Sequence, residues 1–216
     1  MPWIYEIAPP MWPSSRGREK IQRDKIDMTN KHPGLLRADA ACLIVVDIQE
    51  RFRAVMADAN ALIGVSVRLV KTFRALELPI IVTEQYPKGL GHTVEELREA
   101  LGDEASTHTK TCFSSCGSDE VCSRLVEQRI SQALVCGIEA HVCVSQTVHD
   151  LIQRGLSVHV AVDGVASRIA HDHDRDVALS RMARAGAVLT TSEAAAFELL
   201  EDARHPKFKQ VQALYK

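Results

Sequence analysis

The chain has 216 residues, a length typical of a single domain. It is 46% hydrophobic and 25% charged, which is the composition of a globular protein, and 26 basic residues nearly balance 28 acidic ones. A net charge of -2 gives no electrostatic reason to expect a nucleic acid or an anionic membrane as a partner. No apolar run reaches the ~20 residues that a membrane-spanning helix needs.

The first 38 residues differ in character from the rest of the chain. They begin "MPWIYEIAPPMWPSSRGREK", which lacks the long apolar core of a secretory signal. We therefore expect residues 1–38 to form an N-terminal extension, an arm or a disordered segment, ahead of a domain at residues 39–216. Six cysteines in a chain without an export signal predict reduced thiols and a cytoplasmic protein.

Short apolar runs alternate with longer periodic segments from about residue 40 onward. The short runs are rich in β-branched residues, which favours strands. We predict strands at residues 41–46, 80–83, 132–136, 157–162 and 187–190, with a weaker candidate at 106–110.

Helical patterns fill the segments between these strands. Apolar residues recur at three- and four-residue steps in 61–77. Thr93 with Glu96, Ser118 and Ser192 are predicted to cap three further helices. This alternation predicts an α/β fold with a parallel sheet and helices on both faces. Ligands of such sheets bind beyond the carboxyl ends of the strands, so those positions are candidate site residues.

Three chemically different side chains follow predicted strands: Asp47, Lys110 and Cys143. Taken alone, an aspartate there is typical of a turn, a lysine of a solvated surface, and a cysteine of a small buried apolar group. Cys143 differs because it lies where a helix should begin, and free N–H groups at a helix start favour a thiolate. The combination predicts a nucleophilic thiol supported by an acid and a cation.

Three segments carry a resemblance to a known superfamily. "LIVVDIQERF", "KTCFSS" and "GIEAHVCV" resemble the opening strand, lysine motif and nucleophile motif of the isochorismatase-like cysteine hydrolases, which include nicotinamidases and N-carbamoylsarcosine amidases. The C-terminal tail resembles the isochorismatase domain-containing protein subgroup in particular. The resemblance covers roughly residues 40–216. It implies a three-layer fold with a six-stranded parallel sheet of order 3-2-1-4-5-6 and helices on both faces.

The resemblance also implies roles for individual residues. Asp47, Lys110 and Cys143 would form the catalytic triad, and the backbone N–H groups of Glu139 and Cys143 would form an oxyanion hole. The peptide bond between Ile138 and Glu139 would be cis. The implied reaction is hydrolysis of a small-molecule amide, or a related C–N or acyl bond, through a thioester on Cys143.

Five residues near these motifs are candidate lining residues of a substrate pocket, although each could equally serve packing. They are Gln49, Phe52, Gln85, Tyr86 and Phe113.

One departure from the superfamily pattern concerns metals. Nicotinamidases carry an Asp-x-His element after the second strand, whereas this chain reads "TEQYPKGLGHT" there. We therefore expect no metal and no cofactor, and interpret His92 and the "HDHD" run at 171–174 as solvated or helix-capping groups.

Other functions remain open from the sequence alone. The domain could be a thiol redox sensor or a binding scaffold, or an isochorismatase-type vinyl ether hydrolase. A zinc module from Cys112, Cys116 and Cys122 is a further alternative, although their spacing is not a standard zinc pattern. The resemblance implies a homo-oligomer. An apolar stripe at Phe208, Val211 and Leu214 is suited to docking a second copy or to packing on its own domain.

Overall fold

The computed structural model describes residues 32, 34–102 and 107–216. His32–Lys216 form one compact unit. Most of the expected extension lies outside the described residues, but its last part does not. Leu36 is fully buried, and the backbone N–H groups of Leu36 and Arg37 donate to Glu198 at 2.9 Å and Gln132 at 2.8 Å. Residues 34–38 therefore pack with the domain.

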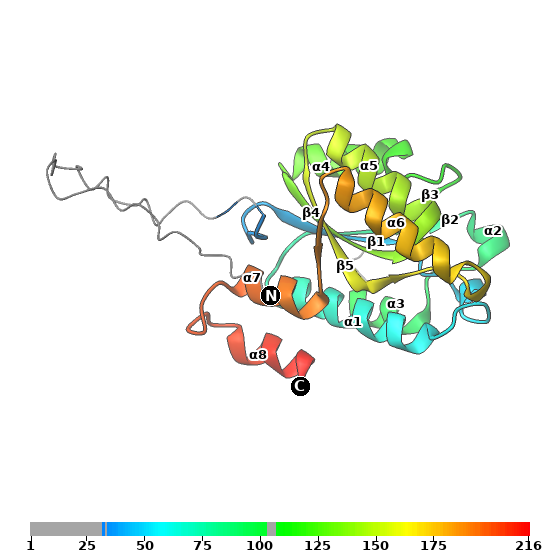
Figure 1. Ribbon diagram of the computed structural model, residues 1–216. Helices are drawn as coiled ribbons and strands as arrows, with labels where there is room; N and C mark the ends of the chain where they lie inside the picture. Colours follow the sequence, from blue (N-terminus) through cyan, green and yellow to red (C-terminus); the bar gives the residue numbers. More distant parts are fainter. Residues whose placement is uncertain (1–31, 33, 103–106) are drawn as a thin grey trace, which may run out of the picture. The chain divides into compact units, whose positions relative to one another are not determined.

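Six parallel strands form one sheet in the order β3-β2-β1-β4-β5-β6 (Figure 1). This confirms the predicted fold class and strand order, and the weak strand candidate at 106–110 is β3. The strands are β1 Ala41–Val46, β2 Ile80–Gln85, β3 Thr107–Lys110, β4 Gln132–Ile138, β5 Ser157–Ala166 and β6 Val188–Thr190.

Helices cover both faces of the sheet. One face packs against α1, α3 and α7, and the other against α4, α5 and α6 (Figure 1). The helices are α1 Ala59–Ala75, α2 Pro87–Leu90, α3 Glu95–Leu101, α4 Asp119–Glu127, α5 Ser145–Gln153, α6 Asp172–Arg184, α7 Ser192–Leu200 and α8 Phe208–Gln212. Short turns are η1 Glu50–Phe52, η2 Ser115–Gly117, the π-helical η3 Ala140–Val144, η4 Ile169–His171 and η5 Ala213–Tyr215.

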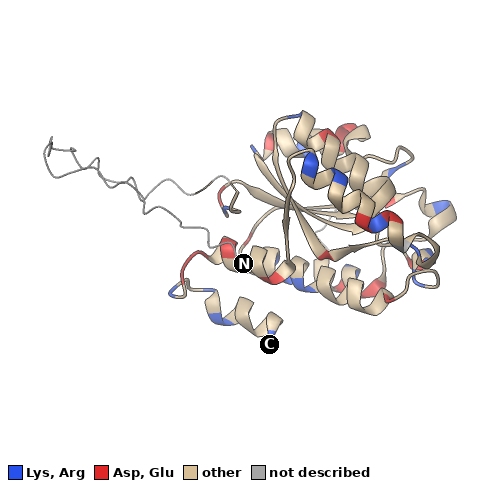
Figure 2. Cartoon of the chain, viewed as in Figure 1, with Lys and Arg blue, Asp and Glu red and all other residues tan. Residues whose placement is uncertain are grey.

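Charged residues of both signs are carried mainly by helices and loops, whereas the strands are mostly uncharged (Figure 2). Every residue of β1 and of β4 is buried. This matches the near-continuous apolar runs that identified these strands, because a sheet covered on both faces needs apolar residues on both sides. In the described part of the chain, we find no helix with the length and apolar character needed to cross a bilayer.

Two of the predicted helix caps are different in the structure. Val94 occupies the position before α3, and both the N–H and the hydroxyl of Thr93 donate to a carboxylate oxygen of Glu84, at 2.6 and 2.8 Å. Ser118 precedes α4 as predicted but makes no side-chain capping bond. The capping pattern located α3 correctly, but a buried carboxylate from the neighbouring strand engages the threonine instead.

The cap of α7 is displaced by one residue for a similar reason. The Thr191 side chain accepts the capping bond, while the Ser192 hydroxyl donates to Asp163 at 2.5 Å. A carboxylate is a stronger acceptor than the alternatives open to a serine, so tertiary contact overrides the local preference.

The C-terminal stripe packs on its own domain. Val211 is fully buried, and Phe208 lies against a cluster that includes Ala75 of α1 and Ala196 of α7. Leu214 is partly buried. The stripe therefore does not supply a free docking surface for a second copy.

Candidate active site

The three side chains predicted to act together come from three separate strand ends at the carboxyl edge of the sheet. Asp47 follows β1, Lys110 ends β3, and Cys143 lies in η3 between β4 and α5. All three are buried, with exposed fractions of 1%, 5% and 6% respectively. An acid, a cation and a thiol are thus removed from bulk water. Electrostatic interactions between them are stronger in the protein interior than they would be in water.

Lys110 is held by a full set of acceptors. Its Nζ donates to Asp47 Oδ2 at 2.6 Å and to Gln85 Oε1 at 2.8 Å. The backbone carbonyls of Phe113 and Cys112 lie at 2.9 and 3.3 Å. A buried ammonium needs such partners to offset its desolvation, so the position of this cation is closely determined.

Asp47 has both carboxylate oxygens engaged. Oδ2 accepts from Lys110, and Oδ1 accepts from the Thr83 hydroxyl at 2.7 Å. The backbone of Asp47 has a left-handed φ of 53°, a conformation that aspartate adopts more readily than most residues. Thr83 was not identified from the sequence as a site residue. It is paired with Val46 in the parallel register, so the strand order brings it beside Asp47.

Cys143 rests as a protonated thiol. Burial raises the pKa of the Cys143 thiol to about 12, the charge of Asp47 and a hydrogen bond with it act in the same direction, and Lys110 opposes them. We therefore expect the resting protein to hold the thiol rather than the thiolate that the helix start favoured. The side chain sits within a π-helical turn beside a carboxylate, and the desolvation of a thiolate there exceeds the benefit from the lysine.

A close approach of β1 and β4 brings the two halves of the site together. Gly137 has a φ of +132°, and a Cβ built there would lie 2.1 Å from the Val46 carbonyl oxygen. Only glycine fits this contact. Since Asp47 directly follows Val46, the contact brings the end of β1 against the strand that leads to η3.

The residues between Gly137 and the thiol carry two further features. The Ile138–Glu139 peptide bond is cis. The Glu139 side chain is buried, and its Oε2 accepts from the backbone N–H and the guanidinium of Arg168 at 3.1 and 2.8 Å. From the sequence we assigned Glu139 a backbone role only. Its side-chain partner lies 29 positions away, and no local pattern points to it.

Two of the candidate pocket residues have their polar groups fully engaged. Gln49 is buried; its Oε1 accepts from the Gln85 N–H at 2.8 Å, and its Nε2 donates to the carbonyls of Gln85 and Gly91. Gln85 accepts from Lys110 and donates to the Thr111 carbonyl at 2.7 Å. Both glutamines therefore hold loops and the lysine in place.

The three aromatic candidates lie in different settings. Phe52 is partly buried against the core, whereas Tyr86 and Phe113 are 54% and 52% exposed. Tyr86 lines an open cavity of about 500 Å³ that reaches Lys110 but neither Asp47 nor Cys143. This cavity lies beside β3 and η2 and is lined by Tyr86, Pro87, Lys88, Thr109, Lys110, Thr111, Cys112, Gly117 and Ser118.

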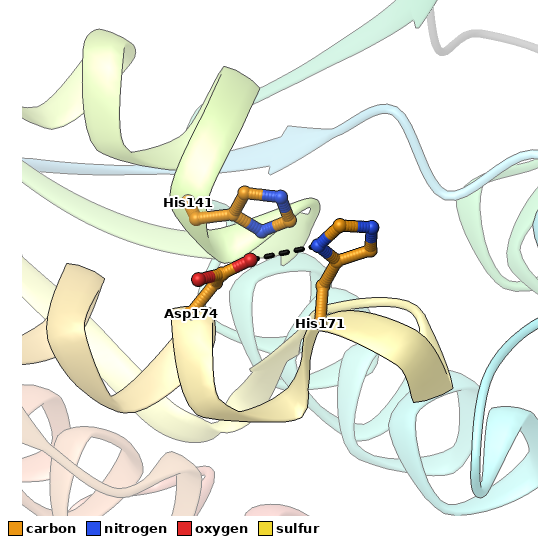
Figure 3. Close-up of side chains that lie close together, drawn as sticks. All are labelled: His141, His171 and Asp174. Carbon is orange, nitrogen blue, oxygen red and sulfur yellow. Dashed lines mark hydrogen bonds and ion pairs between the residues drawn. The ribbon is translucent and has the colours of Figure 1, made fainter.

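Potential metal ligands gather elsewhere. Among the residues that the structure describes, the donor atoms of His141, His171 and Asp174 all lie within 4.8 Å of one another (Figure 3). All six cysteines are free, and Cys112, Cys116 and Cys122 do not form such a group. His92 instead pairs with Glu84 at 3.1 Å. The zinc module considered for the cysteines is therefore not supported.

Comparison with known proteins identifies the family of this chain. The family model of the isochorismatase domain matches residues 41–194. Isochorismatase domain-containing protein 2 of Homo sapiens is 44% identical over 186 residues, which are 85% of this chain and 86% of the human protein. A Caenorhabditis elegans structure described as MAR1 ribonuclease is 45% identical, has a TM-score of 0.79, and covers 83% of this chain and 91% of its own.

A more distant structure shares the fold alone. YcaC of Escherichia coli, described as an octameric hydrolase of unknown specificity, is 22% identical with a TM-score of 0.74, over 86% of this chain and 98% of its own. The family match covers most of the described residues and contains Asp47, Lys110 and Cys143. The chain therefore belongs to the isochorismatase family and has the hydrolase fold of that family.

Proposed function

We propose that this protein is a cysteine-dependent hydrolase that cleaves an amide, or a related C–N or acyl bond, of a small molecule. The observation that carries the proposal is the Asp47 carboxylate. It is oriented by hydrogen bonds from Thr83 and Lys110, and its charge is close enough to the Cys143 thiol to raise the pKa of that thiol. A base beside a nucleophile, oriented by a third group, is the arrangement that nucleophilic catalysis requires.

The raised thiol pKa makes proton removal part of the reaction. As Sγ of Cys143 attacks the carbonyl carbon, its proton passes to Asp47, an S–C bond forms, and the carbonyl oxygen becomes an oxyanion. Collapse of this intermediate restores the carbonyl and breaks the C–N bond. The departing nitrogen takes the proton from Asp47, leaving an amine or ammonia and a thioester.

Water completes the cycle. Asp47 takes a proton from a water molecule as the water oxygen bonds to the thioester carbon. The S–C bond then breaks, a carboxylic acid leaves, and the proton passes from Asp47 to the sulfur of Cys143. Lys110, which forms an ion pair with Asp47 in the resting site, stays positively charged and stabilises the negative charge that develops there. The backbone N–H groups of Glu139 and Cys143 are the proposed donors to the oxyanion, because Glu139 precedes the turn that carries the thiol and Cys143 lies within it.

The alternative of a redox sensor fits the site less well. Sensor cysteines react as thiolates and are accessible to solvent. Cys143 is 6% exposed, and its pKa is raised rather than lowered. Vinyl ether hydrolysis does not need a thiol nucleophile, so the presence of Cys143 beside Asp47 favours acyl chemistry.

RNA is a second candidate substrate, because the C. elegans structure that is 45% identical to this chain is described as a ribonuclease. The net charge of -2 offers no general attraction for RNA phosphates. A small amide substrate therefore remains the first choice, and an RNA substrate belongs in the same assay.

The decisive experiment measures ammonia or amine release by the full-length protein on a panel of small amides. Cys143→Ala should lower kcat by about a thousandfold or more, since the nucleophile is lost. Cys112→Ser is the matched control, because Cys112 is exposed and free; it should keep full activity. Turnover that survives Cys143→Ala would reject the proposal.

A covalent intermediate gives a test that is independent of rate. Intact-mass spectrometry during turnover should show the chain with one added acyl group, removed by hydroxylamine and absent from Cys143→Ala. An RNA oligonucleotide incubated in parallel should remain intact. RNA cleavage without amide turnover would replace the hydrolase proposal with a nuclease.

A further inference from the structure

A second cluster of chemically capable side chains lies beside the proposed nucleophile turn but outside the triad. His141 belongs to η3, His171 ends η4, and Asp174 lies in the first turn of α6. The three side chains point toward one another from two chain segments (Figure 3). One donor atom from each lies within 4.8 Å of the other two.

Each of these side chains is held in place by a neighbour. His141 Nδ1 lies 2.8 Å from the Ser167 hydroxyl, and His171 Nδ1 lies 2.7 Å from Asp174 Oδ2. The two imidazole rings stack with their centres 5.3 Å apart and their planes at 19°. All three residues are partly exposed, so an ion from solvent could reach them.

The charges of this cluster suit a cation. Asp174 contributes a carboxylate, whose Oδ2 lies 2.7 Å from His171 Nδ1. Two stacked imidazoles repel each other when both carry a proton. A divalent ion bound between neutral imidazoles avoids that repulsion, because all three ligands share its charge and neutral imidazole is the form that ligates metals.

We propose that His141, His171 and Asp174 form a binding site for a divalent transition-metal ion, with Zn²⁺ as the best match. Two imidazole nitrogens and one carboxylate oxygen form a ligand set that zinc accepts, with a fourth position left for water. Zinc bonds of about 2.0–2.1 Å place ligand atoms roughly 3.3 Å apart in a tetrahedron, so small side-chain rotations close the site. Imidazole ligands favour zinc over magnesium or calcium.

This site departs from the prediction made from the sequence, in which the run at 171–174 was solvated and no metal was expected. His141 lies 30 positions from His171 and joins it only through the packing of η3 against η4 and α6. The ion would also tie α6 to the turn that carries Cys143. The inference does not rest on the proposed hydrolysis, because none of the three ligands belongs to the triad.

Zinc titration of the full-length protein, stripped with a chelator, tests the inference directly by calorimetry. A Cys112→Ser, Cys143→Ala background removes the exposed thiol and the proposed nucleophile as competing ligands. One Zn²⁺ should bind per chain. His171→Ala and Asp174→Asn should each weaken binding by about 10–100-fold or more.

His173→Ala is the matched control, because His173 is exposed and lies in the same run; it should leave the affinity unchanged. Circular dichroism of the metal-free variants verifies that each is folded. The inference is overturned if no Zn²⁺ binds, or if His171→Ala binds it as tightly as the parent.

Discussion

Cys143 and Cys112 differ in exposure, a property that governs thiol reactivity. The Cys143 thiol is buried with a raised pKa of about 12, whereas Cys112 is exposed. The sequence alone favoured Cys143 as the most reactive cysteine, because a helix start and a lysine promote a thiolate. In the structure, burial and Asp47 raise the pKa of Cys143 against the opposing effect of Lys110, so we now expect the reverse order for the resting protein.

Alkylation with iodoacetamide at pH 7, followed by peptide mapping, should therefore modify Cys112 before Cys143. Labelling of Cys143 should speed up as the pH rises, because its thiolate fraction grows toward the raised pKa. Denatured protein, in which all six cysteines are exposed, serves as the control for peptide recovery. Faster labelling of Cys143 than Cys112 at pH 7 would show that the native thiol is activated.

Thr83 is the second residue whose role only the structure reveals. Its buried hydroxyl donates to Asp47 Oδ1 at 2.7 Å. Thr83→Val keeps the shape and removes the donor, so the free energy of unfolding should fall by about 1.5–3 kcal/mol. Urea denaturation measures this loss. Thr109→Val, at an exposed position of β3, should change stability little, and equal effects would exclude a special role for Thr83.

At the scale of elements, the pairing of β1 with β4 determines where the site forms. Gly137→Ala would place a methyl group 2.1 Å from the Val46 carbonyl oxygen and force apart β1 and β4, the strands that lead to Asp47 and Cys143. We expect a loss of about 3 kcal/mol or more in unfolding free energy. Gly155→Ala is the control: its φ is also positive at +87°, but nothing lies within 4 Å. It should cost only about 1 kcal/mol.

A histidine inside β5 makes the stability of the sheet depend on pH. His159 is fully buried, and neither ring nitrogen has a hydrogen-bond partner among the described residues. Burial lowers the pKa of His159 below its ordinary value of 6.5, against a weaker opposing effect of Glu198. The unfolded chain therefore takes up a proton at a higher pH than the folded chain does.

It follows that the contribution of His159 is fully present above about pH 6.5 and is lost as the pH falls toward its folded pKa. His159→Leu should remove this loss. We would measure unfolding by urea at pH values about half a unit apart. As the pH falls from about 7.5 to 5.5, the unfolding free energy of His159→Leu should rise relative to that of the wild type. His173→Leu, the same substitution at an exposed site, is the control. A parallel dependence in wild type and His159→Leu would contradict the assignment.

For the whole molecule, we still expect a homo-oligomer, although the C-terminal stripe no longer supports it. Exposed apolar side chains offer another surface: Ile169 and Val55 are 61% and 40% exposed, and the Ile169 N–H donates to the Val55 carbonyl at 2.9 Å. Neighbouring exposed apolar groups are typical of contact surfaces.

Light scattering after size-exclusion chromatography should give a mass that is a multiple of 23.9 kDa. Ile169→Glu should shift it toward the monomer, because a charge would be buried in the interface. Val126→Glu, on the exposed face of α4 at 77% exposure, is the control and should leave the assembly intact. A monomer mass for the unmodified protein at micromolar concentration would contradict the prediction of a homo-oligomer.

The sequence by itself determined the architecture and the candidate triad. The apolar runs of β1 and β4 identify strands buried on both faces, and the alternation with helices identifies a parallel sheet. The strand order and the roles of Asp47, Lys110 and Cys143 came from motif resemblance, since periodicity carries no information on which strands are neighbours. Such local patterns are readable because they depend on residues close together in the chain.

Tertiary structure alone decided the chemical state and the partners of the site. The protonated thiol, the Thr83 contact with Asp47 and the displaced caps all depend on groups brought together from distant positions. The cluster of His141, His171 and Asp174 is the clearest case, because two segments supply its ligands. Burial and neighbouring charges determine the pKa of a group, and both arise only once the chain has folded. The same holds for the grouping of side chains that are distant in the sequence.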